Sequence, residues 1–153
     1  MFRATLADAI ERVFQDNPNF AGLSSLKVFT EFFGPNSFAG LHKTDDPKRL
    51  ALFDVWAEPF GMIGPEQFVA DFGHPGPQAA RVVYQGKLTG QFVEDVRLVK
   101  YKVNEGVVCK GGALRRASPV GGGPDLWMAK IKPYAYLEKL KAAFAQDWER
   151  CWE

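Results

Sequence analysis

The chain has 153 residues, of which 46% are hydrophobic, and this size predicts one domain over residues 1–153 with a substantial core. A formal net charge of +1 excludes a strong overall field for nucleic acid or membrane, so a polyanion would need a local cationic site. The two cysteines, Cys109 and Cys151, form neither a disulfide framework nor a metal-binding pattern, which favours a reducing, cytoplasmic setting. No stretch has the long apolar run of a signal peptide or of a membrane span, so no membrane partner is expected.

The first 33 residues predict a helix followed by a strand. Thr5 to Asp8 forms a capping-box pattern, and apolar residues follow at helical spacing to about Gln15. Leu26 to Phe33 alternates with aromatic side chains on both faces, which predicts a strand that is covered on both sides. Glu31 lies among these aromatics, where an unpaired carboxylate would be costly. It is either an acid paired with a lysine at the edge of the core or an acid that binds a ligand hydroxyl.

Short elements follow a long polar connection. Leu50 to Trp56 predicts a second strand, which contains Asp54. Gly64 and Pro65 open a short helix with proline in its first turn. Residues 81–84 predict a short strand, and residues 89–99 predict a helix.

An acid and a lysine flank the next predicted strand. Residues 104–112, Asn-Glu-Gly-Val-Val-Cys-Lys-Gly-Gly, read as a turn, a short apolar strand and two glycines that end it. Glu105 lies before the strand and Lys110 near its far end. This arrangement suits a site for a metal-bound phosphate.

A Gly-rich loop precedes a strand from Leu126 to Lys132, in which Lys130 and Lys132 share a face because alternate side chains do. Two such lysines repel each other unless an anion or acids lie between them. The pair is either a solvated face or a phosphate site, and the apolar neighbours of Lys130 favour the phosphate site.

A last helix after Pro133 carries one apolar stripe that we expect to lie in the core. The stripe consists of Leu137, Leu140, Phe144, Trp148 and Trp152. Short strands and helices without regular alternation predict an α+β fold with mainly antiparallel sheets and flanking helices.

In their order, these segments resemble the covalent nucleotidyltransferases, specifically polynucleotide ligases of the RNA ligase type. Residues 29–40, Phe-Thr-Glu-Phe-Phe-Gly-Pro-Asn-Ser-Phe-Ala-Gly, are similar to motif III of that superfamily in its RNA ligase variant. Residues 52–55 resemble motif IIIa, residues 105–110 motif IV, and residues 130–132 motif V. The resemblance covers nearly the whole chain.

The resemblance implies part of a ligase nucleotidyltransferase domain, of ATP-grasp-like architecture, that binds ATP or AMP with Mg²⁺. Glu31 would bind the ribose, Phe53 would stack on the purine, and Lys110 would be a further nucleotide contact. The implied partners are a nucleotide and RNA, or another nicked polynucleotide, with a 5′-phosphate end.

The same resemblance implies three catalytic residues, Glu105, Lys130 and Lys132. Glu105 would hold the metal, while the two lysines would hold the α-phosphate and neutralise charge during in-line transfer. The reaction of the family forms lysyl-AMP, transfers AMP to a 5′-phosphate, and seals the strand.

The chain departs from the family at the nucleophile, a lysine in a Lys-x-Asp-Gly motif upstream of motif III, which is absent here. Lys43 to Asp46 imitates that motif, but it follows motif III and has Asp46 in place of the glycine, so we interpret it as a solvated loop. The chain therefore resembles the C-terminal two-thirds of the domain, and a second polypeptide would supply the lysine. The alternative is a catalytically inactive module that binds a nucleotide or RNA. A purely structural remnant is disfavoured because the motif residues occur together.

Overall fold

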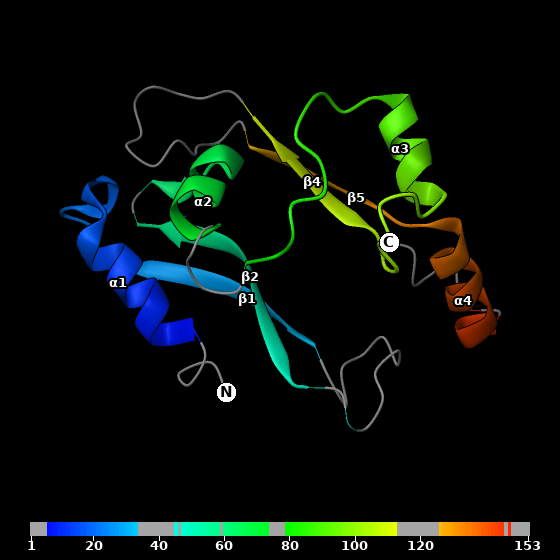
Figure 1. The fold of residues 1–153 in the computed structure, drawn as a ribbon, viewed down its shortest axis with the longest axis horizontal. Helices are drawn as coiled ribbons and strands as arrows, with labels where there is room; N and C mark the ends of the chain where they lie inside the picture. Colours follow the sequence, from blue (N-terminus) through cyan, green and yellow to red (C-terminus); the bar gives the residue numbers. More distant parts are fainter. Residues whose placement is uncertain are drawn as a thin grey trace. The chain divides into compact units, whose positions relative to one another are not determined.

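The computed structural model describes residues 6–33, 45, 47–58, 60–73, 79–112, 126–145 and 147 (Figure 1). The chain forms two compact units, Met1–Arg81 with Gly111–Leu126, and Val82–Lys110 with Trp127–Glu153. Within the described residues, short antiparallel strands are mixed with helices, which confirms the α+β class. The single domain over residues 1–153 stays a prediction.

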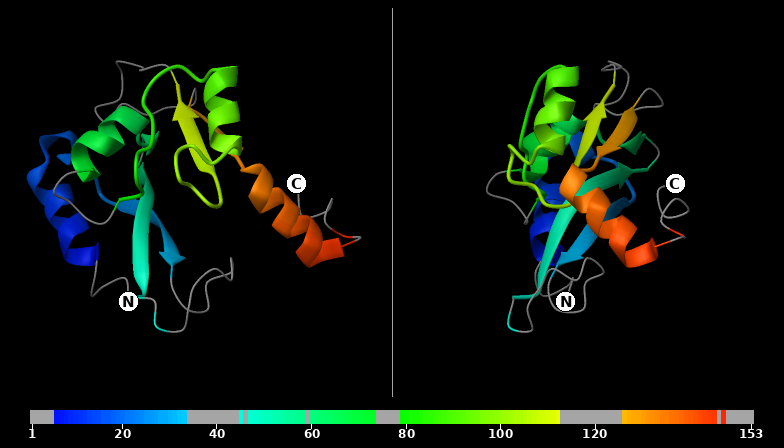
Figure 2. Two further views of the ribbon diagram at one scale, coloured as in Figure 1. Left: turned by 45° about the vertical axis from the view of Figure 1, so that its right-hand side comes forward. Right: turned by 90° about the vertical axis from the view of Figure 1, so that its right-hand side faces the viewer.

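The first unit is an antiparallel sheet with helices on one face (Figure 2). Its strands lie in the order β1-β2-β3, and β1 and β2 form the long pair. The elements are α1 (Asp8–Asp16), the 3₁₀ helix η2 (Pro18–Phe20), β1 (Leu26–Phe33), β2 (Arg49–Ala57), β3 (Gly61–Met62) and α2 (Pro65–Phe72).

A single apolar cluster joins α1, α2 and β2. Phe20 and Phe72 are fully buried members of this cluster, with ring centroids 6.1 Å apart. The Asp71 carboxylate also links the helical segments, because it accepts hydrogen bonds from Asn17 Nδ2 at 2.6 Å and Gln67 Nε2 at 2.7 Å. The buried members of the cluster are Leu6, Ile10, Phe20, Leu50, Leu52, Val55, Ala57, Ile63 and Phe72.

The helix ends differ in how well the sequence predicted them. Helix α1 begins at Asp8 after Ala7, which makes no side-chain capping bond, while Thr5 lies outside the described residues. Helix α2 has Pro65 in its first turn as predicted, because proline lacks only an N–H that the first turn leaves unbonded.

Strand β1 is covered on one face only, so the prediction of cover on both faces is wrong. Val28 and Phe32 pack against the core cluster, whereas Lys27, Phe29 and Glu31 are exposed. Aromatic side chains on both faces suggested two covered faces, but both helices of this unit pack on the same side of the sheet.

The described residues of the second unit form a two-stranded sheet and two helices (Figure 1). Its elements are α3 (Gly90–Arg97), β4 (Val107–Gly111), β5 (Trp127–Ile131) and α4 (Tyr134–Phe144). Helix α3 packs against β5. The two predicted strands and the helix predicted over residues 89–99 are therefore confirmed, the last helix is confirmed from Tyr134 to Phe144, and the strand predicted over residues 81–84 is not.

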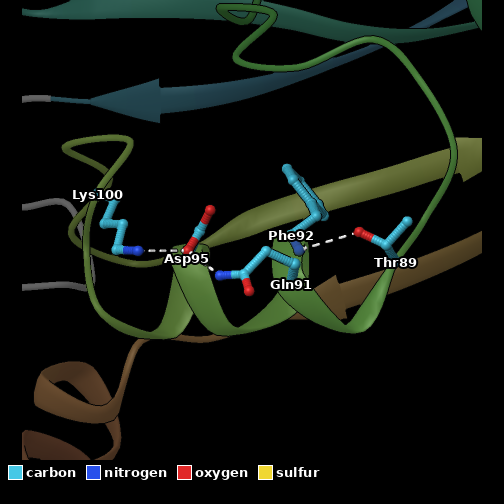
Figure 3. Close-up of polar contacts among 5 residues, drawn as sticks. All are labelled: Thr89, Gln91, Phe92, Asp95 and Lys100. Carbon is cyan, nitrogen blue, oxygen red and sulfur yellow. Dashed lines mark hydrogen bonds and ion pairs between the residues drawn. The ribbon is translucent and has the colours of Figure 1, made fainter.

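Helix α3 is capped and braced by its own side chains (Figure 3). The Thr89 hydroxyl accepts a hydrogen bond from the Phe92 N–H at 3.2 Å, which satisfies one of the unbonded donors of the first turn. The Asp95 carboxylate accepts bonds from Gln91 Nε2 and Lys100 Nζ, each at 2.7 Å. The hydrogen bond from Lys100, and next that from Gln91, lowers the pKa of Asp95, and the same bond to Asp95 raises the pKa of Lys100.

Residues 81–84 form no strand, which corrects the prediction for that segment. The Tyr84 ring instead stacks on Phe92, with ring centroids 4.4 Å apart, and Tyr101 packs against both rings. An aromatic cluster thus determines the path of this segment, a contact that strand periodicity does not reveal.

Helix α4 has no buried residue among those described, so the predicted core stripe is wrong for this part of the helix. Leu137, Leu140 and Phe144 are half-buried. Trp148 and Trp152 lie outside the described residues. In the part of the chain that the structure describes, no helix has both the length and the apolar character needed to cross a membrane.

Candidate functional site

The Glu105–Gly106 turn contacts the end of β5. Gly106 has φ +111°, and a Cβ placed on it would overlap the Ile131 carbonyl oxygen and lie 3.1 Å from the Lys132 Cα. Only glycine tolerates both this backbone angle and this approach. Because Gly106 precedes β4 and Ile131 ends β5, the two strands run antiparallel, and the acid-bearing turn lies beside Lys132.

Lys132 lies one residue beyond β5 and is half-buried. Its ammonium Nζ lies 5.5 Å from the centre of the Tyr136 ring. Tyr136 belongs to the first turn of α4, which begins directly after Pro133. The main chain of Lys132 therefore contacts Gly106, and its ammonium group lies near the ring of Tyr136.

Glu105 is half-buried, and none of the described residues makes a hydrogen bond or an ion pair with it. No group of three His, Cys, Asp or Glu residues in the described ranges could hold a metal ion by itself. Mg²⁺ usually binds to one or two carboxylates and completes its shell with phosphate oxygens and water. Glu105 could supply one such carboxylate if a phosphate bound beside it.

The other predicted residues of the β4–β5 sheet differ in how exposed their side chains are. Lys110 in β4 is half-buried, whereas Lys130 in β5 is exposed, which corrects the apolar setting expected for Lys130. Cys109 is the middle residue of β4 and is half-buried, and this burial raises the pKa of its thiol. A raised pKa lowers the thiolate fraction and therefore the reactivity of this thiol.

The outer face of the β1–β2 pair carries the other two predicted nucleotide contacts. The ring centroids of Phe29 and Phe53 lie 6.4 Å apart, and Glu31 shares the face of Phe29 by strand alternation. Phe53 reaches this face through a bulge, because Phe29 pairs with Asp54 while Thr30 pairs with Leu52. Such an extra residue re-aims side chains and is frequent beside functional sites.

The predicted site residues therefore form two groups, one in each unit. Glu31 and Phe53 share a face of the first sheet, and the turn with Glu105 meets the strand end with Lys132 in the second unit. Lys110 and Lys130 belong to the β4–β5 sheet. Of the imitation motif at residues 43–46, only Asp45 lies in the described part, and it is exposed.

Comparisons of the chain with known protein families, with curated proteins and with solved structures gave no match. The functional assignment therefore depends on the residues and their geometry.

Sequence reasoning did not single out Tyr136 or Phe29. Tyr136 contacts the Lys132 ammonium, and Phe29 contacts the ring of Phe53. An aromatic residue four positions after Lys132 was a weak signal, because Pro133 separates the strand from the helix and hides the spacing. Phe29 was visible only as a member of an alternating strand.

Proposed function

We propose that this chain is an RNA ligase-type nucleotidyltransferase domain that binds ATP or AMP with Mg²⁺ and serves in joining polynucleotide ends at a 5′-phosphate. The contact between the Glu105–Gly106 turn and the Ile131–Lys132 strand end carries this proposal. This contact brings an acid and a cation to one end of the β4–β5 sheet. The order of the motifs along the chain also resembles that of the ligases. A half-buried acid without a described partner beside a lysine supports a ligand at this end more than a solvated face.

The chemistry of such a site is mainly electrostatic. Lys130 and Lys132 donate N–H groups to the phosphate oxygens and neutralise the negative charge that develops in transfer. Glu105 would hold Mg²⁺, which supplies Lewis-acid stabilisation of the phosphate oxygens when it is bound. Lys110 is proposed as a further contact to the nucleotide.

Glu31 and Phe53 are proposed as contacts to the nucleoside. The half-buried Phe53 offers a ring face for the purine, and Glu31 is an exposed carboxylate that can accept hydrogen bonds from ribose hydroxyls. Base stacking tolerates any purine, so ATP and GTP would be distinguished by contacts other than Phe53.

The nucleophile would come from a second polypeptide. Its lysine amine would attack the α-phosphorus, so that a P–N bond forms, the bond to pyrophosphate breaks, and the amine loses a proton. AMP would then pass to the 5′-phosphate of the polynucleotide. A cytoplasmic setting is part of this proposal, because the two cysteines suggest no oxidised framework.

Nucleotide binding is the first test. Isothermal titration with AMP and with ATP plus Mg²⁺ should show binding by the wild type, and Lys132→Ala should weaken it roughly 10- to 150-fold, the value of a charge-assisted hydrogen bond. Lys139→Ala, which removes an exposed α4 lysine and the same charge, should bind like the wild type. Equal affinity of the two variants would contradict the proposed site.

Transfer of labelled AMP distinguishes the enzyme from the inactive module. With α-labelled ATP and Mg²⁺, the chain alone should acquire no label, because it has no Lys-x-Asp-Gly motif upstream of residue 29. Addition of a polypeptide encoded next to this chain that carries such a motif should place the label on that polypeptide. If nucleotide binds but no mixture transfers label, the absent motif favours the alternative, a nucleotide- or RNA-binding module.

A further inference from the structure

Lys132 is restrained at both its main chain and its charge. Its Cα lies against Gly106, and its ammonium lies 5.5 Å from the centre of the Tyr136 ring. A cation over a ring face is attracted by the negative potential of the π-system. The ring therefore favours one position among the many that a lysine with four rotatable side-chain bonds can adopt.

Tyr136 is itself placed by a well-anchored helix start. Pro133 is fully buried and precedes α4, and the Tyr136 N–H donates to the Pro133 carbonyl oxygen at 3.1 Å. In the same turn, the Tyr134 hydroxyl donates to Glu94 Oε2 at 3.3 Å, and the Arg97 guanidinium lies 5.6 Å from the centre of the Tyr134 ring. These contacts hold the first turn of α4 against α3.

We propose that Tyr136 is a positioning residue, whose ring holds the Lys132 ammonium ready for a nucleotide phosphate. The inference rests on the proposed function. It also makes the two lysines of the Lys-x-Lys pair unequal: Lys130 is exposed, and the described residues provide no ring beneath its charge. Lys132 would thus lose less side-chain freedom than Lys130 when a phosphate binds.

The test compares three variants of the full chain in AMP titrations. Tyr136→Leu removes the ring and should weaken AMP binding about two- to fivefold, the usual range for an exposed cation–π contact. Tyr136→Phe keeps the ring and should bind like the wild type. Phe144→Leu removes a ring from the last residue of the same helix, at the opposite end from Lys132, and it should also bind like the wild type.

Side-chain NMR provides a readout that does not depend on affinity. In the wild type, the ring should shift the Lys132 Hε protons upfield, and AMP should shift the same signals. Tyr136→Leu should abolish the ring shift. If that variant does not fold, the wild-type spectrum still decides, since the lack of either effect overturns the proposal.

The outcomes separate the two proposals. If the wild type does not bind AMP, the proposed function fails, and the positioning role fails with it. If the wild type binds and Tyr136→Leu binds equally well, only the positioning role is refuted. It is also refuted if Tyr136→Phe is as weak as Tyr136→Leu, because the hydroxyl and not the ring would then matter.

Discussion

The approach of Gly106 to β5 can be tested by placing a methyl group there. Gly106→Ala puts a side chain on a residue with φ +111° and overlaps the Ile131 carbonyl oxygen. An L-residue in a left-handed conformation costs about 1–2 kcal/mol. Forcing extra volume into a packed contact costs about 1–3 kcal/mol more. The free energy of unfolding should therefore fall by roughly 2–5 kcal/mol.

Gly22→Ala is the matched control. Gly22 also has a positive φ, +80°, but a Cβ there would meet no atom within 4 Å. This variant should lose only about 1–2 kcal/mol, the backbone part alone. Its AMP affinity should not change, because Gly22 lies outside the proposed site.

Urea unfolding followed by circular dichroism gives the two stabilities, and amide exchange locates the loss. Gly106→Ala should speed exchange in β4 and β5 and weaken AMP binding, while Gly22→Ala should do neither. Equal destabilisation by the two substitutions would refute the close contact between the Glu105–Gly106 turn and β5.

Three further predictions concern stability. Phe72→Ala should lower the unfolding free energy by about 3–5 kcal/mol in urea, because the ring is fully buried. Thr89→Ala should cost about 1 kcal/mol in the same assay through loss of the α3 cap, whereas Thr89→Ser should be nearly neutral. The lowered pKa of Asp95 stabilises the fold above the ordinary carboxyl pKa, and this contribution disappears as pH falls through the lowered value. Lys100→Met should raise the Asp95 titration midpoint in NMR, and an unchanged midpoint would refute the bond.

Local patterns predicted most elements because burial periodicity and turn chemistry depend on residues that are close together in the sequence. Strand β2, the Pro65 start of α2 and strand β4 lie where the patterns indicated. The strand predicted over residues 81–84 is absent because Tyr84 packs against Phe92, which is eight residues further along the chain. The prediction that the apolar stripe of α4 lies in the core was wrong. Periodicity indicates that a helix has an apolar face, but it does not show whether another element covers that face.

The candidate site was predictable as a set of residue types and only in part as geometry. Glu105 and Lys132 were singled out as an acid and a cation, but their proximity depends on Gly106 passing the end of β5. The face of the sheet on which Phe53 lies depends on a bulge, and the residue alternation in β2 does not predict that bulge. Both features arise from pairing between distant strands.

By itself, the sequence determined the composition of the chain and predicted its α+β class, whereas the resemblance to the RNA ligases stays a prediction. Residues 1–28 contain no Lys-x-Asp-Gly motif. Only the tertiary structure decided that β1 has one open face, and that Lys132 lies between Gly106 and Tyr136. The physical reason is that local propensity depends on neighbours in the chain, whereas exposure and the position of a charge depend on which distant segments pack together.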